Sequence, residues 1–412
     1  MFHHKFKNTL LAFALFGTAT LGAETRQEVT AEALQKNPEL HVLEQRIAAA
    51  KGRVTTARTY SNPELTVAPG VKHTNDMGRT ANEFHGDFAV SQLFKFPGKR
   101  ALGIAIEQRN VELTELAREA FRFQLTSKVR RAFYDFLAAE KIVASRRDQV
   151  TSAKMFVESA KKRAEAGYAS DFETVKSQAD LITATKALLQ ADGRVNAGRV
   201  TMNALMGRIP SAPLEITGEF SGVQPRGSQA DFLALALARN PGIRTQTRQA
   251  EIAGLSLRAT RFGRRPDFAV GPSLEYTRFE QIVGLSASFA LPLWDQKKGE
   301  LQTATAEQRK ALAELEKTRA DVSAEVTKAA ANVELARAQL ALYSPAFIER
   351  LKAVTSQAEQ AYAQNTTTLI IYLDAKRTYF DTLAEYYDAL GNVAQSRADL
   401  ESAVGVPLEL NP

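Results

Sequence analysis

The side chains that could carry out catalysis or hold metal ions form no recognisable constellation in this sequence. Cysteine is absent, which removes thiolate metal sites, cysteine nucleophiles and disulfides together. The five methionines are scattered, and His41, His73 and His85 do not show the spacing of metal ligands. His85 is expected on a strand as an interior residue. The sequence therefore predicts no enzyme, no cofactor and no metal site.

The side chains with the clearest chemical potential are three acids that follow two similar turn signals. Asp171 and Glu173 come directly after residues 167–170, and Asp374 lies about two turns of helix beyond residues 365–368. In a threefold-symmetric assembly each acid forms a ring of three, which attracts cations and can narrow an aperture. The alternative is that these acids only stabilise helix N-termini through the macrodipole.

The two turns themselves are predicted from residue type. Gly167 and Asn365 occupy matching positions, and these two residue types best tolerate a left-handed backbone at the end of a helix. Ser170 and Thr368 then suit the N-caps of the returning helices. We therefore expect Gly167, Asn365 and Thr367 to lie at the far end of two helical hairpins, together with the three acids.

These turns belong to a duplication that organises the whole chain. Asn37-Pro38 recurs as Asn240-Pro241 roughly two hundred residues later, so each half is expected to be one copy of the same unit. Each copy reads as helices, then two alternating strands, then a long helical hairpin. The predicted ranges are 24–213 for the first repeat, with a β-hairpin at 64–93 and a helical hairpin at 98–207, and 214–412 for the second, with 267–291 and 297–404.

The strands have one apolar face and one small or polar face, and each is long enough to cross a bilayer at a tilt. An ordinary half-buried hairpin would show the same alternation. Four strands cannot close in lipid, whereas three chains supply twelve, so a membrane location requires a homotrimer with a shared β-barrel. The residues predicted to face outer-membrane lipid are Phe88, Val90, Val270, Leu274, Leu285 and Phe289.

The helices are predicted to be unusually long. Residues 98–165 contain no proline, and core positions in both copies advance by three and then four residues, which is typical of coiled-coil packing. At ~1.5 Å per residue such a helix spans about 100 Å, which suits a tube crossing a wide compartment.

The N-terminus and the charge distribution indicate an exported protein and argue against some classes of function. Residues 1–23 resemble a secretory signal peptide, with Lys5 and Lys7 before an apolar core and Ala23 at a suitable cleavage point. After Ala23 no run of 18 apolar residues occurs, so no transmembrane helix is expected. The net charge is +7, but bases and acids are interleaved along helix faces, which argues against nucleic-acid binding.

Several motifs in both copies resemble the TolC-like outer membrane efflux family, and in particular its CzcC-type heavy-metal branch. They are Asn37-Pro38-Glu39-Leu40, Asn62-Pro63-Glu64-Leu65, Ser91-Gln92-Leu93 with Gly98-Lys99-Arg100, Arg265-Pro266-Asp267, Leu291-Pro292-Leu293-Trp294-Asp295 with Gly299, and a tip segment ending Tyr372-Leu373-Asp374-Ala375. Two features depart from relatives. The lipidated cysteine of many relatives is absent, and the 366–369 segment lacks the arginine that locks the aperture in some of them.

The resemblance implies a mainly α-helical protein with a small β part. It would form a trimeric α-helical tunnel in the periplasm, joined to a shared 12-stranded β-barrel in the bacterial outer membrane. It further implies a passive exit duct for heavy-metal cations, working with a periplasmic adaptor, or membrane fusion protein, and an inner-membrane RND-type pump. The alternatives are a channel for drug efflux or type I secretion, and, from another class, a periplasmic coiled-coil scaffold.

Overall fold

A computed structural model describes residues 23–76, 79–167, 170–220, 227–277 and 280–408. The predicted signal peptide, 1–23, lies outside these residues except for Ala23, as do Tyr168 and Ala169 of the first turn signal.

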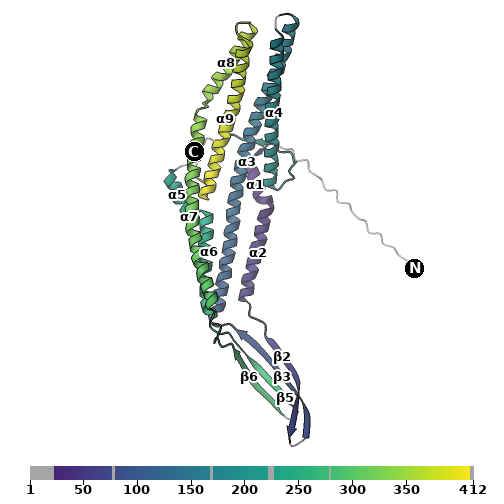
Figure 1. Ribbon diagram of the computed structural model, residues 1–412, viewed down its shortest axis with the longest axis vertical. Coiled ribbons are helices and arrows are strands. Elements are labelled where there is room, and N and C mark those ends of the chain that lie inside the picture. The colour runs from purple at the N-terminus through teal and green to yellow at the C-terminus, as the bar shows by residue number, and fades with distance from the viewer. Residues whose placement is uncertain (1–22, 77–78, 168–169, 221–226, 278–279, 409–412) are drawn as a thin grey trace, which may run out of the picture.

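The chain is an elongated molecule in which long helices run side by side along one axis and a single sheet extends from one end (Figure 1). The fold is therefore mainly α-helical with a small β part, as expected. The two halves repeat the same element order. The first half contains β1 (Glu24–Thr25), α1 (Arg26–Lys36), α2 (Pro38–Arg58), β2 (Glu64–Asp76), β3 (Arg79–Phe94), α3 (Lys99–Glu165) and α4 (Asp171–Met206). The second contains β4 (Ile216–Thr217), α5 (Gln229–Arg239), α6 (Pro241–Gly263), β5 (Phe268–Thr277), β6 (Gln281–Phe289), α7 (Lys298–Ala341), α8 (Pro345–Ala363) and α9 (Leu369–Val404).

The repeated Asn-Pro pair has the same structural role in both halves. Asn37 caps α2 by accepting a hydrogen bond from the Glu39 amide at 3.0 Å, and its own amide group donates to the Leu205 carbonyl at the end of α4, also at 3.0 Å. Asn240 caps α6 through the Gly242 amide and donates to the Ala403 carbonyl of α9 at 2.9 Å. The proline begins the helix, where its missing N–H is not needed.

Each Asn-Pro turn is covered by a glycine that ends the last helix of the same half. Gly207 and Gly405 have left-handed backbones, with φ of 71° and 85°. A Cβ on Gly207 would lie 2.8 Å from the Lys36 carbonyl oxygen, and one on Gly405 would lie 2.4 Å from Pro241. Glycine is therefore required at both positions by backbone conformation and by space.

The length of the molecule follows from α3, its longest described helix. It is continuous for 67 residues, which corresponds to about 100 Å. Its middle packs with α1 and α4 around Val29, Phe133 and Met202, which are fully or almost fully buried. The second half has an equivalent core of α5, α7 and α9 around Phe232, Val326 and Val404. Among the described residues, no helix combines the length and the apolar character needed to cross a membrane.

The second helical hairpin, predicted at 297–404, differs from the first because its outgoing arm is not one helix. It is divided into α7 and α8 at residues 342–344, where Ser344 caps α8 and Pro345 begins it. Pro345 cannot donate the amide hydrogen bond that a continuous helix needs at this position. The range 297–404 thus contains three helices, α7, α8 and α9.

The four strands form one antiparallel sheet in the order β2-β3-β5-β6, so the hairpins of the two halves lie next to each other. Cross-strand pairs place Val67 opposite Phe88, Phe88 opposite Leu274, and Leu274 opposite Val283. Directly opposed residues share a face, so one face of the sheet is apolar across all four strands. The other face carries mostly small and polar residues.

Candidate channel tip and sheet faces

The turn between α3 and α4 and the turn between α8 and α9 lie at the end of the molecule opposite the sheet (Figure 1). Gly167 and Asn365 both have the left-handed backbone that their residue types indicated, with φ of 77° and 57°. The amide of Gly167 donates to the Ala164 carbonyl, and that of Asn365 to the Tyr362 carbonyl. Ser170 and Thr368 occupy the N-cap positions, but neither side chain makes a capping hydrogen bond.

Two hydrogen bonds join the first hairpin to the second at this tip. The Arg163 guanidinium, near the end of α3, donates to Oδ1 of Asn365 at 2.6 Å. The Tyr362 hydroxyl, at the end of α8, donates to Oε2 of Glu173 at 2.8 Å. Arg163 also lies over the Tyr362 ring, 5.1 Å from its centre. Arg163 thus connects the end of α3 to both the turn residue Asn365 and the last turn of α8.

An aromatic cluster lies directly behind these contacts. Tyr362 and Tyr372 stack with ring centres 5.7 Å apart, and Phe156 packs against both. Burial and the hydrogen bond to Glu173 raise the pKa of Tyr362 to about 12. The neutral phenol is therefore the stable form at the tip, and it keeps its donor role at all ordinary pH values.

A buried lysine borders the aromatic cluster. Lys376 is only 4% exposed, its ammonium has no hydrogen-bond partner among the described residues, and it lies 5.6 Å from the centre of the Tyr372 ring. Burial lowers the pKa of Lys376, while the nearby Asp180 and Glu359 oppose that shift. Burial in turn raises the pKa of Asp180. Sequence patterns gave no sign of this burial, because the charged groups near Lys376 come from different helices, Asp180 from α4 and Glu359 from α8.

The three acids predicted at the tip have different surroundings. Asp171 and Glu173 lie in the first turn of α4, Asp171 exposed and Glu173 bonded to Tyr362. Asp374 is exposed on α9 and pairs with Arg377 at 2.9 Å. Within one chain the Asp374 carboxylate thus has a counter-charge on its own helix. Thr367 is half-buried in the turn.

The six residues predicted to face lipid all lie on the apolar face of the sheet. The register places Phe88 and Val90 of β3 on the same face as Val270 and Leu274 of β5. Leu285 and Phe289 of β6 belong to that face too, and both are largely exposed. An exposed apolar surface that extends over four strands indicates an interaction with lipid or protein rather than with water.

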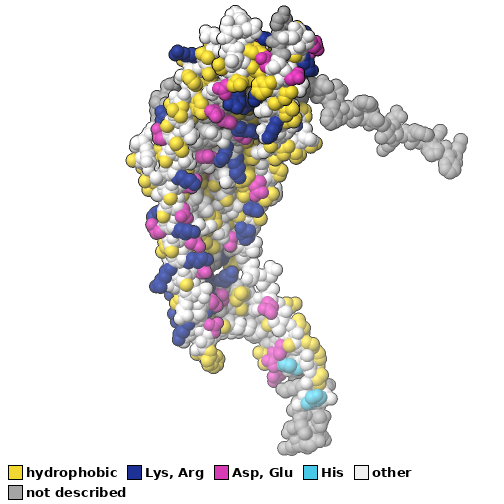
Figure 2. Space-filling view, turned by 45° about the horizontal axis from the view of Figure 1, so that its top comes forward, with side chains coloured by type: hydrophobic (Ala, Val, Ile, Leu, Met, Phe, Trp, Pro, Cys, Tyr) yellow, Lys and Arg dark blue, Asp and Glu magenta, His cyan; other side chains and the backbone are white. Residues whose placement is uncertain are grey.

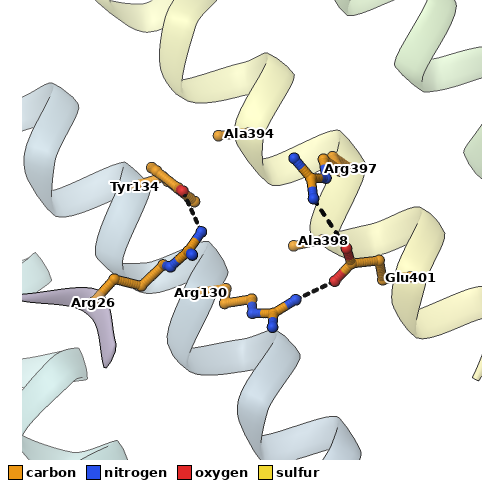
Figure 3. A pocket seen from close by; sticks show the side chains of 7 residues that line it. All are labelled: Arg26, Arg130, Tyr134, Ala394, Arg397, Ala398 and Glu401. Carbon is orange, nitrogen blue, oxygen red and sulfur yellow. Dashed lines mark hydrogen bonds and ion pairs between the residues drawn. The ribbon is translucent and has the colours of Figure 1, made fainter. Parts of the chain in front are cut away.

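A polar pocket lies where the middle of α3 packs against the C-terminal end of α9 (Figure 3). Glu401 of α9 is almost completely buried and accepts hydrogen bonds from Arg130 of α3 and from Arg397 of its own helix. Arg26, just after β1, donates to the Tyr134 hydroxyl at 2.7 Å. These contacts hold elements together, and nothing about them indicates catalysis.

Comparisons with known proteins agree with this architecture. Residues 29–208 and 232–406 both match the profile of the family described as outer membrane efflux protein, which accounts for the duplication. The cobalt-zinc-cadmium resistance protein CzcC of Cupriavidus metallidurans is 20% identical over 393 residues, covering 95% of this chain and 92% of that protein.

Solved structures of outer-membrane channels have the same fold. The channel OprN superposes with a TM-score of 0.78 at 16% identity, covering 93% of this chain and 90% of that one. The CmeC outer membrane channel of Campylobacter jejuni gives 0.75 at 16% identity, covering 92% and 85%. The family match sets aside the alternative of a periplasmic scaffold. The chain belongs to the outer membrane efflux protein family, and it is an outer-membrane efflux channel of a tripartite system rather than an enzyme.

Proposed function

We propose that this protein is the passive exit duct for heavy-metal cations, acting as a homotrimer with a periplasmic adaptor and an inner-membrane RND-type pump. The observation that carries the choice of substrate is the likeness to CzcC, a cobalt-zinc-cadmium resistance protein, over almost the whole of both chains. A conduit needs no catalytic residues, and its lumen has only to bind its cargo weakly enough to release it.

The open edges of the sheet support the trimer. Strands β2 and β6 each have one unpaired edge in the single chain. Open edges are not tolerated in lipid, and three copies would supply twelve strands for a closed barrel. The apolar face would then lie against lipid, with Leu285 and Phe289 among its exposed side chains, and the polar face would line the lumen.

A second feature supports insertion into the membrane. The segment after β6 exposes Leu291, Leu293 and Trp294, and Trp294 is 91% exposed. Tryptophan is enriched at the boundary between lipid and water, because its ring is apolar and its N–H is polar. This segment would therefore lie at the periplasmic boundary of the outer membrane, where the strands meet the helices.

The tip would contact the adaptor and the pump. The α3–α4 and α8–α9 turns, to which Gly167, Asn365 and Thr367 belong, lie at the end farthest from the sheet (Figure 1), where a periplasmic tube would meet its partners. Cross-linkers placed at Ser170 and Thr367 should capture the adaptor or the pump. Capture of outer-membrane components only would reverse the proposed orientation.

The substrate is tested in cells. Deletion of the gene should lower tolerance to Co²⁺, Zn²⁺ or Cd²⁺, and a plasmid copy should restore it. Unchanged metal tolerance together with new sensitivity to antibiotics would favour drug efflux instead. Loss of a secreted protein with normal metal tolerance would favour type I secretion.

A further inference from the structure

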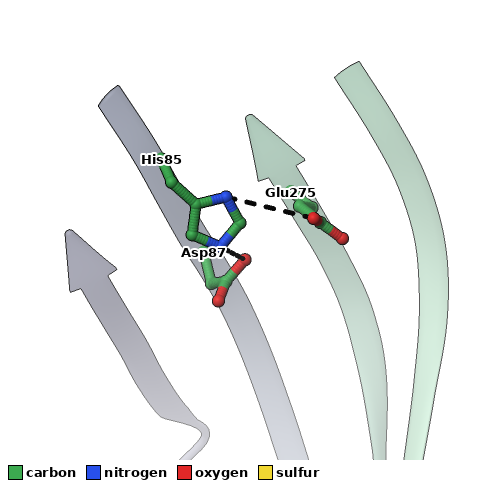
Figure 4. A group of neighbouring side chains, drawn as sticks. All are labelled: His85, Asp87 and Glu275. Atoms are coloured by element: carbon green, nitrogen blue, oxygen red, sulfur yellow. Dashed lines mark ion pairs between the residues drawn. The ribbon is translucent and has the colours of Figure 1, made fainter. Parts of the chain in front are cut away.

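Three side chains with metal-binding chemistry meet on the polar face of the sheet. His85 and Asp87 alternate along β3, so both point to the same face, and Asp87 lies directly opposite Glu275 of β5. The imidazole lies between the two carboxylates (Figure 4). In the space-filling view, histidine side chains lie on the sheet close to acidic ones, whereas the Lys and Arg side chains in view lie over the helices, interleaved there with further acids (Figure 2).

The distances are close to those of a ligand set. Nε2 of His85 lies 3.3 Å from Oδ1 of Asp87, and Nδ1 lies 3.9 Å from Oε1 of Glu275. One ligand atom from each residue can be chosen so that all three lie within 4.8 Å of one another. Ligand atoms around a tetrahedral metal ion at ~2.1 Å are roughly 3.4 Å apart. A bound ion would use one ring nitrogen, so the exposed carboxylate that faces the other nitrogen would rotate toward the ion.

One ring nitrogen of His85 lacks a hydrogen-bond partner in the described structure. Its Nδ1 atom is buried and has no hydrogen-bond partner among the described residues. A buried ring nitrogen without a partner is costly, and an imidazole nitrogen is a preferred metal ligand. In the described part of the chain, the ion pairs of Asp87 and Glu275 are both with His85, so no lysine or arginine competes for the carboxylates.

There is room for an ion beside this cluster. On the β2 side, the residue opposite His85 is Gly70, which has no side chain. A Cβ built on Gly70 would meet only the His85 carbonyl oxygen, at 3.9 Å. Asp87 and Glu275 are each about half exposed, so the site is open to solvent.

We propose that His85, Asp87 and Glu275 form a binding site for a divalent transition-metal ion such as Zn²⁺ or Co²⁺. One nitrogen and two carboxylate ligands suit such ions, whereas Mg²⁺ and Ca²⁺ prefer oxygen ligands alone. Three protein ligands leave coordination positions for water, so the ion can enter and leave. The interpretation of this site as a station on the export path rests on the proposed function, whereas the binding itself does not.

Binding is tested on the purified full-length protein in detergent. Zn²⁺ titrated by calorimetry in the presence of excess Mg²⁺ should bind at one site per chain, and Co²⁺ should give the visible absorption of a protein-bound ion. His85→Gln should weaken Zn²⁺ binding at least tenfold, and Asp87→Asn and Glu275→Gln should each weaken it several-fold. The matched control is His73→Gln, because His73 lies on the same sheet beside Asn82 and outside the cluster.

The outcomes separate this proposal from the proposed function. The proposal is overturned if the wild-type protein binds no Zn²⁺ under excess Mg²⁺, or if His85→Gln and His73→Gln bind it equally. In that case the cluster is only a histidine paired with two acids. Metal sensitivity of the deletion strain without Zn²⁺ binding would overturn the site alone. Zn²⁺ binding lost in His85→Gln, together with normal metal tolerance of the deletion strain, would keep the site and overturn the proposed substrate.

Discussion

Two ion pairs between α3 and α9 show how much a single residue's contribution depends on its burial. Glu401 is almost completely buried and shared by Arg130 and Arg397, whereas Asp399 pairs with Arg131 where both side chains are about half exposed. Removing one member of a buried pair leaves charge in a place that water cannot reach. An exposed pair is screened, and its loss is small.

Glu401→Gln should therefore lower the free energy of unfolding by about 3–5 kcal/mol, because the guanidinium groups lose their shared carboxylate. Asp399→Asn, two residues away, should cost only about 0–1 kcal/mol. Denaturant unfolding of the purified variants measures both values. Equal losses in the two variants would show that burial does not set the strength of these pairs.

The hydrogen bond between Tyr362 and Glu173 should make the tip sensitive to high pH. The folded-state pKa of Tyr362, about 12, lies above the ordinary tyrosine value of about 10. A raised pKa means that the phenol stabilises the contact fully below pH 10, and that this stabilisation is lost as the pH rises from about 10 to 12. Removing the hydroxyl should cost about 1.5–3 kcal/mol, because the acceptor is charged.

This loss can be followed with spin labels, because the chain contains no cysteine. Labels on Ser170→Cys and Thr367→Cys should show a narrow distance distribution at pH 8 that broadens above pH 10. In Tyr362→Phe the distribution should already be broad at pH 8. Tyr343→Phe is the control, since Tyr343 bonds Glu385 near the break between α7 and α8. If the distance distribution changes neither with pH nor in Tyr362→Phe, the hydrogen bond between Tyr362 and Glu173 does not hold the two turns together.

At the scale of the elements, a glycine is needed where the backbone has a positive φ, and two glycines of the first helical hairpin show the difference. Gly167 has φ of 77° with open space around it, so a side chain there meets no neighbour and the cost is backbone strain alone. A left-handed backbone costs an ordinary residue about 1–2 kcal/mol, and a β-branched residue more. Gly193 of α4 has equally open space but no positive φ.

Gly167→Val should therefore impair efflux while the yield of trimer stays close to wild type, because the strain is confined to the turn. Gly193→Val should leave both unchanged. Efflux is measured as intracellular metal after loading, and trimer as the heat-resistant band from outer membranes. Normal efflux by Gly167→Val would mean that the turn does not need its native shape.

The sheet should respond to charge on one face only. Leu285 lies on the apolar face and Ser288 on the opposite one. An arginine facing lipid costs about 2–4 kcal/mol near the bilayer midplane, whereas one facing water is tolerated. Leu285→Arg and Val270→Arg should thus reduce insertion into the outer membrane, and Ser288→Arg should insert normally. Normal assembly of Leu285→Arg, with the folded protein free in the periplasm, would contradict the lipid-facing assignment.

Much of the element pattern could be predicted because it depends on local rules. The two-residue alternation, the three-and-four stepping and the Asn-Pro and Gly signals act over a few residues, and β2, β3, α3 and the left-handed turns follow from them. The break between α7 and α8 also has a local cause, because Ser344 caps α8 and Pro345 begins it.

Contacts between the two halves could not be predicted in the same way. Only the packing of α3 beside the second hairpin brings Arg163 to Asn365. Glu275 meets His85 only through the pairing of β3 with β5, which joins strands from different repeats. The acids near the buried Lys376 likewise come from two other helices, α4 and α8. Such contacts depend on register and packing, which a single sequence does not determine.

At the scale of the whole molecule, the sheet and the tip lie at opposite ends of helices about 100 Å long. A trimer of this shape would repeat each tip residue three times around one axis. Asp374 would then give three carboxylates, and its ion pair with Arg377 would add three guanidinium groups nearby. The pair is about two-thirds exposed, so solvent screens it and the ring keeps part of its negative field.

Single-channel recordings can distinguish the effects of Asp374 and Arg377 on conduction. Three converging carboxylates attract multivalent cations, so the wild-type channel should be blocked by divalent or trivalent ions added on the periplasmic side. Asp374→Asn should relieve much of that block and lower the preference for cations. Arg377→Gln should strengthen the block, because it removes the counter-charge and keeps the acid. The barrel conductance at low divalent concentration serves as the control and should not change. If both variants are blocked like wild type, Asp374 and Arg377 form only a surface ion pair of α9, and Asp171 becomes the next acid to test as the ring.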